Sequence, residues 1–450
     1  MNIFLQQGGH SFVNLGDLAM LQVAVRRFRE RFPDCRITVL TDPGIVASEY
    51  VDNVFATDVM AVPRVFGPGC LFGRLTRVLG TKDSAIVTRY PILMHGVSLL
   101  RRVTGRSAGS VARFIRALSE ADIVAATGGG YLTDEFPFMV EWTAWLMLAA
   151  QRMGKRTALF GQGIGPLQNR QLRSLLAQAV RNIEVVSLRE GVFGPALMNE
   201  LGLDPRKCVV TGDDALELPY AAARAGIGTK LGVNLRRAFY SGISSDVEVR
   251  VTKVLSDLLA ELQTNPVVIP IDFQEKDAEV GAKVLGHTSF VSSRIGVSDA
   301  IRLASECRVV ITGSYHAAAF ALGQGIPAVC LVGSDYYRNK FVGLASQFSS
   351  GCLVVETNSE DFEKNAADSV ISLWRTAEAL RPQLLESAKA QVELSRSHYC
   401  AFAHDRAPQP NLIWTPSRAG CRPATSASSM ARMCGAGGGQ PGKKNSTGTT

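Results

Sequence analysis

The sequence predicts an α/β protein of two doubly wound domains, each a mostly parallel sheet covered by helices, followed by a disordered tail. Three observations support this prediction. The chain has 450 residues, more than one hydrophobic core usually supports. Its 46% apolar and 20% charged residues are ordinary for a globular protein. Short apolar runs alternate with amphipathic stretches along the chain, as strands and helices do in parallel sheets.

In the first half of the chain, apolar runs predict strands at 2–6, 36–40, 122–127, 156–161 and 184–188. Amphipathic stretches predict helices that begin near residues 16, 138, 169 and 191. In the second half, the same patterns predict strands at 231–235, 266–271, 308–312 and 328–332. Helices are predicted at 244–263, 273–285, 296–305 and 315–324, and a long one at 361–395, with Pro382 inside it, can cross back to the first domain.

The domain boundary is expected near residue 225, because Pro and Gly cluster between Leu218 and Thr229. We therefore predict Rossmann-like domains at 1–224 and 225–400. From Ala407 onward, Gly, Ser, Thr, Pro and Arg replace the apolar periodicity, so the segment 407–450 cannot offset chain entropy by burial. It is predicted to be a disordered basic tail.

The net charge of +8 does not indicate a nucleic-acid partner, because the last 44 residues contribute five Lys or Arg and no acid. The rest of the chain is only +3. Within it, residues 60–116 hold ten basic residues and one acid, Asp83. This segment favours either an ordinary solvated basic face or peripheral contact with an anionic membrane.

The nine cysteines are scattered without CxxC pairs, which is typical of reduced thiols in a cytosolic protein and does not favour metal binding. The first residues resemble a strand rather than a signal peptide. No apolar run approaches the roughly 18 residues of a spanning helix. A cytoplasmic location is therefore expected, with the inner face of the plasma membrane as one possible place.

Glycine-rich strand exits are the first places to look for a ligand site, because ligands collect at the carboxyl ends of parallel strands. After the first strand, Gly8 and Gly9 lead to Asp17, which is positioned to cap a helix or to orient a hydroxyl. The glycine spacing does not fit a dinucleotide fingerprint. Gly128, Gly129 and Gly130 predict a substrate-lining loop rather than a plain turn.

A third exit places Gln162 between glycines, where it reaches into a cleft or simply belongs to a turn closed by Pro166. The fourth is the most specific. Its strand ends at Gly313, Ser314 can cap the next helix, and His316 falls in the first helical turn. A helix N-terminus attracts anions, so His316 is expected to bind or protonate an anionic substrate.

The other histidines are weaker candidates: His10 lies in the first glycine loop, and His95, His287, His398 and His404 are expected at the surface or in packing. Three cations follow predicted strands on the same rim. Arg338 and Lys340 come after the strand that follows His316, and Arg189 comes from the first domain. They suit a ligand with phosphate and carboxylate groups, although each can also be a solvated side chain.

Eight motifs in order resemble the polysaccharide pyruvyl transferase family over about residues 1–350. They are GGxxFxNxGDxAML, TGGGYLxDE, FGQGIGPL, SLREG, TGDDA, GVNLR, EKD and GSYHAxxFALGQGIP. The resemblance implies a fold similar to that of two-Rossmann-domain GT-B glycosyltransferases. It also implies transfer of a pyruvyl group from phosphoenolpyruvate to a sugar of a cell-surface or exopolysaccharide glycan, as a ketal and without a metal or other cofactor.

By the same resemblance, the first domain is the acceptor side and the second the donor side. The family's candidate acid matches His316, its following lysine matches Lys340, and the arginine of its SxRE-type motif matches Arg189. Family members often have Arg-Leu-His where this chain has Ser314-Tyr315-His316. Either Arg338 replaces the missing cation or the donor differs.

If phosphoenolpyruvate is the donor, a protonated His316 delivers a proton to the enol carbon, and a sugar hydroxyl attacks the oxocarbenium-like centre. Asp213, Asp214 or Asp17 accepts the hydroxyl proton or orients the sugar. The acceptor is a glycan, which can be lipid-linked. Two other functions remain open: a glycosyltransferase that uses a nucleotide sugar, and a non-catalytic protein of glycan binding or assembly.

Overall fold

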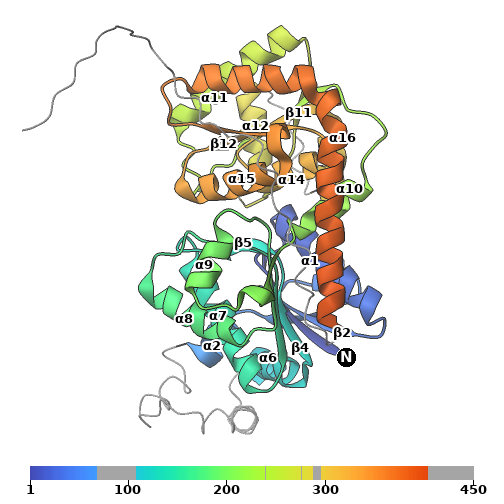
Figure 1. The fold of residues 1–450 in the computed structure, drawn as a ribbon, viewed down its shortest axis with the longest axis vertical. Coiled ribbons are helices and arrows are strands. Elements are labelled where there is room, and N and C mark those ends of the chain that lie inside the picture. Colours follow the sequence, from blue (N-terminus) through green and yellow to red (C-terminus); the bar gives the residue numbers. More distant parts are fainter. Residues whose placement is uncertain (68–107, 239, 275, 287–294, 404–450) are drawn as a thin grey trace, which may run out of the picture. The chain divides into compact units, whose positions relative to one another are not determined.

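The computed structural model describes residues 1–67, 108–238, 240–274, 276–286 and 295–403. All of these residues belong to one compact unit, Met1–Trp414. The described chain forms two parallel sheets with helices between the strands (Figure 1). The α/β class and the doubly wound arrangement predicted from the sequence are therefore confirmed.

The first sheet has the strand order β3-β2-β1-β4-β6-β7-β8, with β5 paired to β6. All of its pairings are parallel. The order reverses direction between β1 and β4, which is where ligands bind in open α/β sheets. The strands are β1 Asn2–Gln6, β2 Arg36–Thr41, β3 Phe55–Asp58, β4 Ile123–Ala126, β5 Gly129–Leu132, β6 Arg156–Ile164, β7 Val185–Leu188 and β8 Cys208–Val210.

Helices connect these strands and bury their apolar sides against the sheet. They are α1 Leu15–Arg31, α2 Ala61–Phe66, α6 Ala108–Glu120, α7 Pro137–Arg152, α8 Arg170–Arg181, α9 Gly194–Glu200 and α10 Glu217–Ala221, with short 3₁₀ turns at Ala47–Glu49, Pro205–Lys207 and Asp214–Leu216.

The second sheet has the order β10-β9-β11-β12-β13, again all parallel. The strand order changes direction between β9 and β11, so a second ligand position is expected at the carboxyl ends of these two strands. The elements are β9 Lys230–Asn234, α11 Ser245–Leu262, β10 Pro266–Val268, α12 Asp277–Val284, α13 Val297–Ser305, β11 Cys307–Thr312, α14 Tyr315–Leu322, β12 Ala328–Val332, α15 Asp335–Phe348, a 3₁₀ turn at Ser349–Gly351 and β13 Cys352–Glu356.

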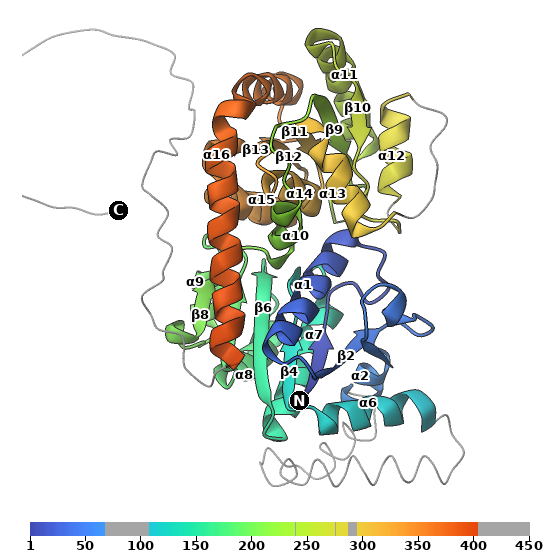
Figure 2. The same ribbon diagram turned by 90° about the vertical axis from the view of Figure 1, so that its right-hand side faces the viewer.

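The last described helix, α16 Phe362–Ala403, contacts both sheets (Figures 1 and 2). It packs on β11 and β13 and, further along, on α1 and β7. The Tyr399 ring stacks on Phe160 of β6 with centroids 3.8 Å apart. Arg27 of α1 donates to Ser395 and pairs with Asp214 at 3.1 Å. The helix thus returns to the first sheet, as its long apolar pattern indicated.

Most predicted elements lie within a few residues of the observed ones, but four strands and four helices were not predicted. Residues 129–132, expected in a loop, form β5. The strands β3, β8 and β13 and the helices α2, α6, α10 and α15 are also new. These strands are only three to five residues long, too short for a clear apolar period.

Several predictions concern residues outside the described ranges. These are the disordered tail 407–450, the histidines His95, His287 and His404, and most of the basic segment 60–116 with its membrane contact. The domain limits at 224 and 225 stay a prediction; the two sheets end and begin at Val210 and Lys230. Among the described residues, every helix is too short or too polar to cross a membrane.

Candidate active site

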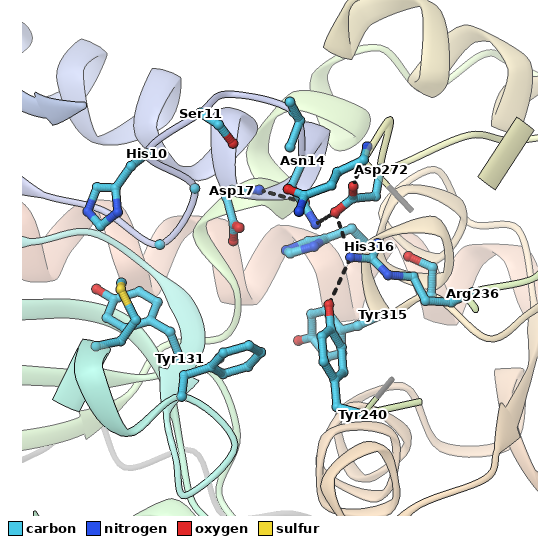
Figure 3. A pocket seen from close by; sticks show the side chains of 18 of the residues that line it. His10, Ser11, Asn14, Asp17, Tyr131, Arg236, Tyr240, Asp272, Tyr315 and His316 are labelled. Carbon is cyan, nitrogen blue, oxygen red and sulfur yellow. Dashed lines mark hydrogen bonds and ion pairs between the residues drawn. The ribbon is translucent and has the colours of Figure 1, made fainter. Parts of the chain in front are cut away.

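A cavity of about 400 Å³ lies at the carboxyl ends of strands from both sheets (Figure 3). It falls in the range of about 300–1,000 Å³ that small-molecule sites occupy. The first sheet contributes the loop after β1, the start of α1, Gly130 of β5 and Arg189 after β7. The second contributes Arg236 after β9, the start of α14, and Lys340 of α15. Most of the predicted site residues therefore meet in one place.

The first turn of α1 is shaped to bring an acid and a histidine together. Asn14 caps the helix, because its side-chain oxygen accepts from the backbone N–H groups of Gly16 at 3.0 Å and Asp17 at 3.2 Å. Asp17 was expected as the possible cap, but its carboxyl is left to line the cavity. A Cβ on Gly16 would overlap the imidazole of His316, so only glycine allows this ring to pack on α1.

His316 lies in the first turn of α14, is 7% exposed and lines the cavity. Its Nε2 has no hydrogen-bond partner and lies 3.8 Å from Oδ2 of Asp213. Burial lowers the pKa of His316 well below 6.5, and the charges of Arg189, Lys340 and Arg236 lower it further. These effects favour the neutral imidazole as long as no anion is bound, so the proton that the sequence-based mechanism assigns to His316 has to be taken up with the donor.

Arg189 is buried and reaches the cavity between two glycines. A Cβ on Gly163 or Gly130 would overlap its guanidinium. Its guanidinium lies 4.1 Å from the centre of the Tyr315 ring, and Nη1 is 3.6 Å from Oδ2 of Asp213. Nη2 has no hydrogen-bond partner. Since a buried donor of this kind is costly to leave unpaired, Arg189 is prepared to bind an anion.

Lys340 projects from α15 toward Gly130, where a Cβ would come within 2.7 Å of its ammonium nitrogen. The ammonium donates to the hydroxyl of Tyr336 and lies 3.7 Å from the centre of that ring. Burial lowers the pKa of Lys340 well below 10.5, and the charge of Arg189 adds to this effect. A ligand with negative charge would raise this pKa by neutralising the surrounding cations.

Arg338, predicted beside Lys340, does not line the cavity. It is exposed on α15 and pairs with Glu356 at 3.0 Å and with Asp335 at 3.6 Å. It cannot replace the missing cation at position 314 from there. The two residues differ because α15 is a helix, so positions two apart point in different directions, whereas the sequence analysis placed both in a strand exit.

Arg236 is the cation that the sequence analysis missed. It is 4% exposed, lines the cavity, and pairs with Asp272 at 2.6 Å (Figure 3). Its Nη2 also donates to the Tyr240 hydroxyl at 3.1 Å, while its Nε has no hydrogen-bond partner. Arg236 follows β9 directly, so the strand-exit criterion that found Arg189 was sufficient to find it.

The three candidate carboxylates have different surroundings. Asp17 lines the cavity, and burial raises its pKa from 3.8 to about 6, a shift that Lys340 reduces and Asp272 increases. Asp213 lies behind His316 and outside the cavity lining, with Oδ1 accepting from the N–H of Ala215 at 2.8 Å. Asp214 is engaged by Arg27, Ser395 and Tyr399. Only Asp17 among these three therefore reaches a ligand directly.

The glycine motif and Gln162 are mostly structural. Gly130 lines the cavity, whereas Gly128 lies against Met20 and Gly161, and Gly129 against the Tyr131 ring. The amide of Gln162 donates to the carbonyl of Thr127 and, at 3.1 Å, to the Tyr131 hydroxyl. Gln162 thus holds Tyr131 in the cavity wall without lining it.

Ser314 occupies the N-cap position of α14 and lines the cavity, but its side chain makes no capping hydrogen bond, contrary to expectation. Its backbone N–H donates to the Thr312 hydroxyl at 2.8 Å. Within the described ranges, no three His, Cys, Asp or Glu side chains are grouped as metal ligands. The expectation that the reaction needs no metal or cofactor stays a prediction.

The family model of polysaccharide pyruvyl transferases matches residues 14–335, which include most of the cavity lining. No curated protein matches the sequence significantly.

Solved structures share this fold at low sequence identity. A putative UDP-N-acetylglucosamine 2-epimerase from Listeria monocytogenes is 13% identical, with 89% of this chain and 95% of that chain covered and a TM-score of 0.55. The UDP-GlcNAc 2-epimerase from Neisseria meningitidis bound to UDP-GlcNAc is 10% identical, with 88% and 98% covered and a TM-score of 0.51. At this identity the likeness shows the fold alone, the GT-B arrangement of two Rossmann-like domains.

Proposed function

Because the chain belongs to the polysaccharide pyruvyl transferase family, and so to a family of enzymes, we propose that it transfers a pyruvyl group from phosphoenolpyruvate to a glycan sugar as a ketal. The observation that carries this proposal is that Arg189, Lys340 and His316 line one cavity. Each of these three side chains can bind an anion through an N–H group. Arg189 and His316 also have polar atoms without partners.

Phosphoenolpyruvate carries a carboxylate and a phosphate, so it needs at least two separate anion contacts. The fork of Arg189 fits a two-oxygen group, and the ammonium of Lys340 fits a phosphate oxygen as a point charge. Arg236 supplies a third cation beside Arg189 and Lys340. We assign to it the role of the arginine that family members often have at the position of Ser314. Its Nε is free to donate to the anion while Nη2 remains with Asp272.

The proposed reaction uses His316 and Asp17 as a proton pair. His316 gives a proton to C3 of the donor, and the oxygen of one sugar hydroxyl bonds to C2 while its proton passes to Asp17. The oxygen of a second hydroxyl then bonds to C2 as the C2–O bond to phosphate breaks. The proton of this hydroxyl returns to His316, and the proton on Asp17 leaves with the phosphate. Asp213 orients and stabilises the charged imidazole from behind.

Donor binding is expected to take up protons. Burial and neighbouring cations lower the pKa values of His316 and Lys340, and a bound anion raises both. Since the bound state then holds more protons, affinity for phosphoenolpyruvate should strengthen as the pH falls through the bound-state pKa values. Calorimetric titration in two buffers of different ionisation enthalpy measures the uptake. Equal heats in both buffers near neutral pH would contradict this prediction.

The proposed function is tested by incubating the enzyme with phosphoenolpyruvate and a panel of glycan acceptors. We expect phosphate release that depends on the acceptor, and a product with the mass increment of a pyruvate ketal. Phosphate release without this increment indicates simple hydrolysis. If neither signal appears with any acceptor, phosphoenolpyruvate is not the donor.

A nucleotide-sugar-dependent glycosyltransferase is the second candidate, and Ser314 is the observation that favours it. A serine carries no charge for the small trianionic donor at the start of α14. The Neisseria meningitidis neighbour is bound to UDP-GlcNAc, a larger and less charged ligand. Protection of this chain against heat by UDP-sugars but not by phosphoenolpyruvate would favour this second function.

A further inference from the structure

We propose that the acceptor sugar stacks on an aromatic face made by His10, Phe138 and Trp142, which line the same cavity as the donor groups. The inference rests on the proposed function, because it assigns the acceptor position of that reaction. The ligand that we propose for this aromatic face is a neutral pyranose, and one face of its ring, which carries C–H groups, contacts the aromatic side chains.

The three rings lie close together. Phe138 and Trp142 are four residues apart on α7, with ring centroids 5.2 Å apart in an edge-to-face arrangement. The His10 ring, from the loop after β1, lies 6.2 Å from Trp142. Phe138 is 45% exposed although it is large and apolar. An exposed apolar side chain at a cavity wall is typical of a binding surface rather than of core packing.

The aromatic face is separated from the donor groups. Figure 3 shows His10 on one side of Asp17 and Arg236 with Tyr240 on the other. The basic side chains among the described lining residues are Arg189, Arg236 and Lys340. Since none of these cations belongs to the aromatic face, an anionic donor is drawn to other parts of the cavity, which leaves the aromatic face to an uncharged ligand. Asp17, between the two, is placed to take a proton from a hydroxyl that approaches C2 of the donor.

The chemistry around the aromatic face also suits a sugar. A pyranose ring has C–H groups on its faces and hydroxyls at its edges, so it needs an apolar plate and nearby polar groups. Asp42 lines the cavity with His10 and can accept hydrogen bonds from hydroxyls. Burial lowers the pKa of His10 to about 4, so its imidazole is neutral at neutral pH and both accepts and donates without adding charge.

The matched control is Trp145, which is on the same helix. Trp142 and Trp145 are both partly buried and pack against the same apolar cluster of the first sheet. Only Trp142 lines the cavity. Loss of either ring therefore affects packing in a similar way, and only loss of Trp142 affects a ligand in the cavity.

The test compares Trp142→Ala, Trp142→Phe and Trp145→Ala in the full chain. With the acceptor found in the transfer assay, we expect Trp142→Ala to raise the acceptor KM about tenfold or more and to leave the phosphoenolpyruvate KM unchanged. Trp142→Phe should recover most of the affinity, and Trp145→Ala should keep both KM values. An unchanged acceptor KM in Trp142→Ala, or an equal rise in Trp145→Ala, overturns the inference.

A second measurement works without any donor. Saturation-transfer NMR with methyl β-D-galactopyranoside and methyl β-D-glucopyranoside should show stronger transfer to ring protons on one side of the sugar, and Trp142→Ala should abolish it. Such binding in a protein that makes no ketal sustains the inference and defeats the proposed donor. Equal transfer to all sugar protons defeats the inference, and so does transfer that survives Trp142→Ala. A lack of binding by both glycosides defeats it as well.

Discussion

Replacement of His316 by Gln is expected to lower kcat for ketal formation by about 10²-fold or more, the usual loss when one general acid is removed. Gln keeps a polar side chain beside Gly16 but cannot carry a proton to the donor carbon. Stopped assays of ketal product measure kcat. The donor dissociation constant should change less than kcat, because Arg189 and Lys340 remain in place.

The matched control for this variant is His398→Gln. His398 is also buried, and it lies on α16 outside the cavity lining. We expect His398→Gln to keep the wild-type kcat, and both variants to show cooperative thermal unfolding. Near-normal turnover of a folded His316→Gln enzyme would remove His316 from the chemistry and leave the proton donor to another group.

Replacement of Arg189 by Gln is expected to lower kcat/KM for phosphoenolpyruvate by about 10²–10³-fold. Loss of one partner from a buried charged contact costs about 2–5 kcal/mol, and about 1.4 kcal/mol corresponds to tenfold. Glutamine is too short to reach through the passage that Gly130 and Gly163 leave for the guanidinium. Steady-state kinetics at varied donor concentration give the ratio.

Arg338→Gln is the control for Arg189→Gln, because Arg338 is an arginine on the exposed side of α15 that pairs with Glu356. Exposed pairs contribute about 0–1 kcal/mol, so kcat/KM should stay within about fivefold of wild type. Arg189→Lys keeps the charge and loses the fork, so its activity should lie between wild type and Arg189→Gln. Full activity in Arg189→Gln would place the donor elsewhere.

The residues that follow predicted strands show how much of the site could be predicted from the sequence. His316, Arg189 and the glycine loop that leads to Asp17 follow predicted strands, and the parallel order of these strands puts their carboxyl ends at one edge. This reasoning needs no tertiary information. It failed for Arg338 because the segment after β12 enters α15 at once, and the helical period decides which side chains face the cavity.

The protonation states of the site residues could not be predicted from the sequence, for a physical reason. The pattern around His316 indicated an anion site and suggested a protonated imidazole. Burial and three neighbouring cations favour the neutral form as long as no anion is bound. These cations come from residues 189, 236 and 340, and only the folded chain sets their distances from His316. Whether His316 carries a proton therefore depends on a bound anion, and the calorimetric measurement of proton uptake tests this dependence.

The sequence alone determined the α/β class, the two parallel sheets and the strand exits that carry His316, Arg189 and Asp17, because local apolar patterns and parallel topology fix these features. Only the tertiary structure decided that Asn14 rather than Asp17 caps α1, that Asp213 stands behind His316, and that Arg338 lies outside the cavity lining. These outcomes depend on burial and on contacts between residues far apart in the chain. Such contacts do not produce a periodic pattern in the sequence from which they could be predicted.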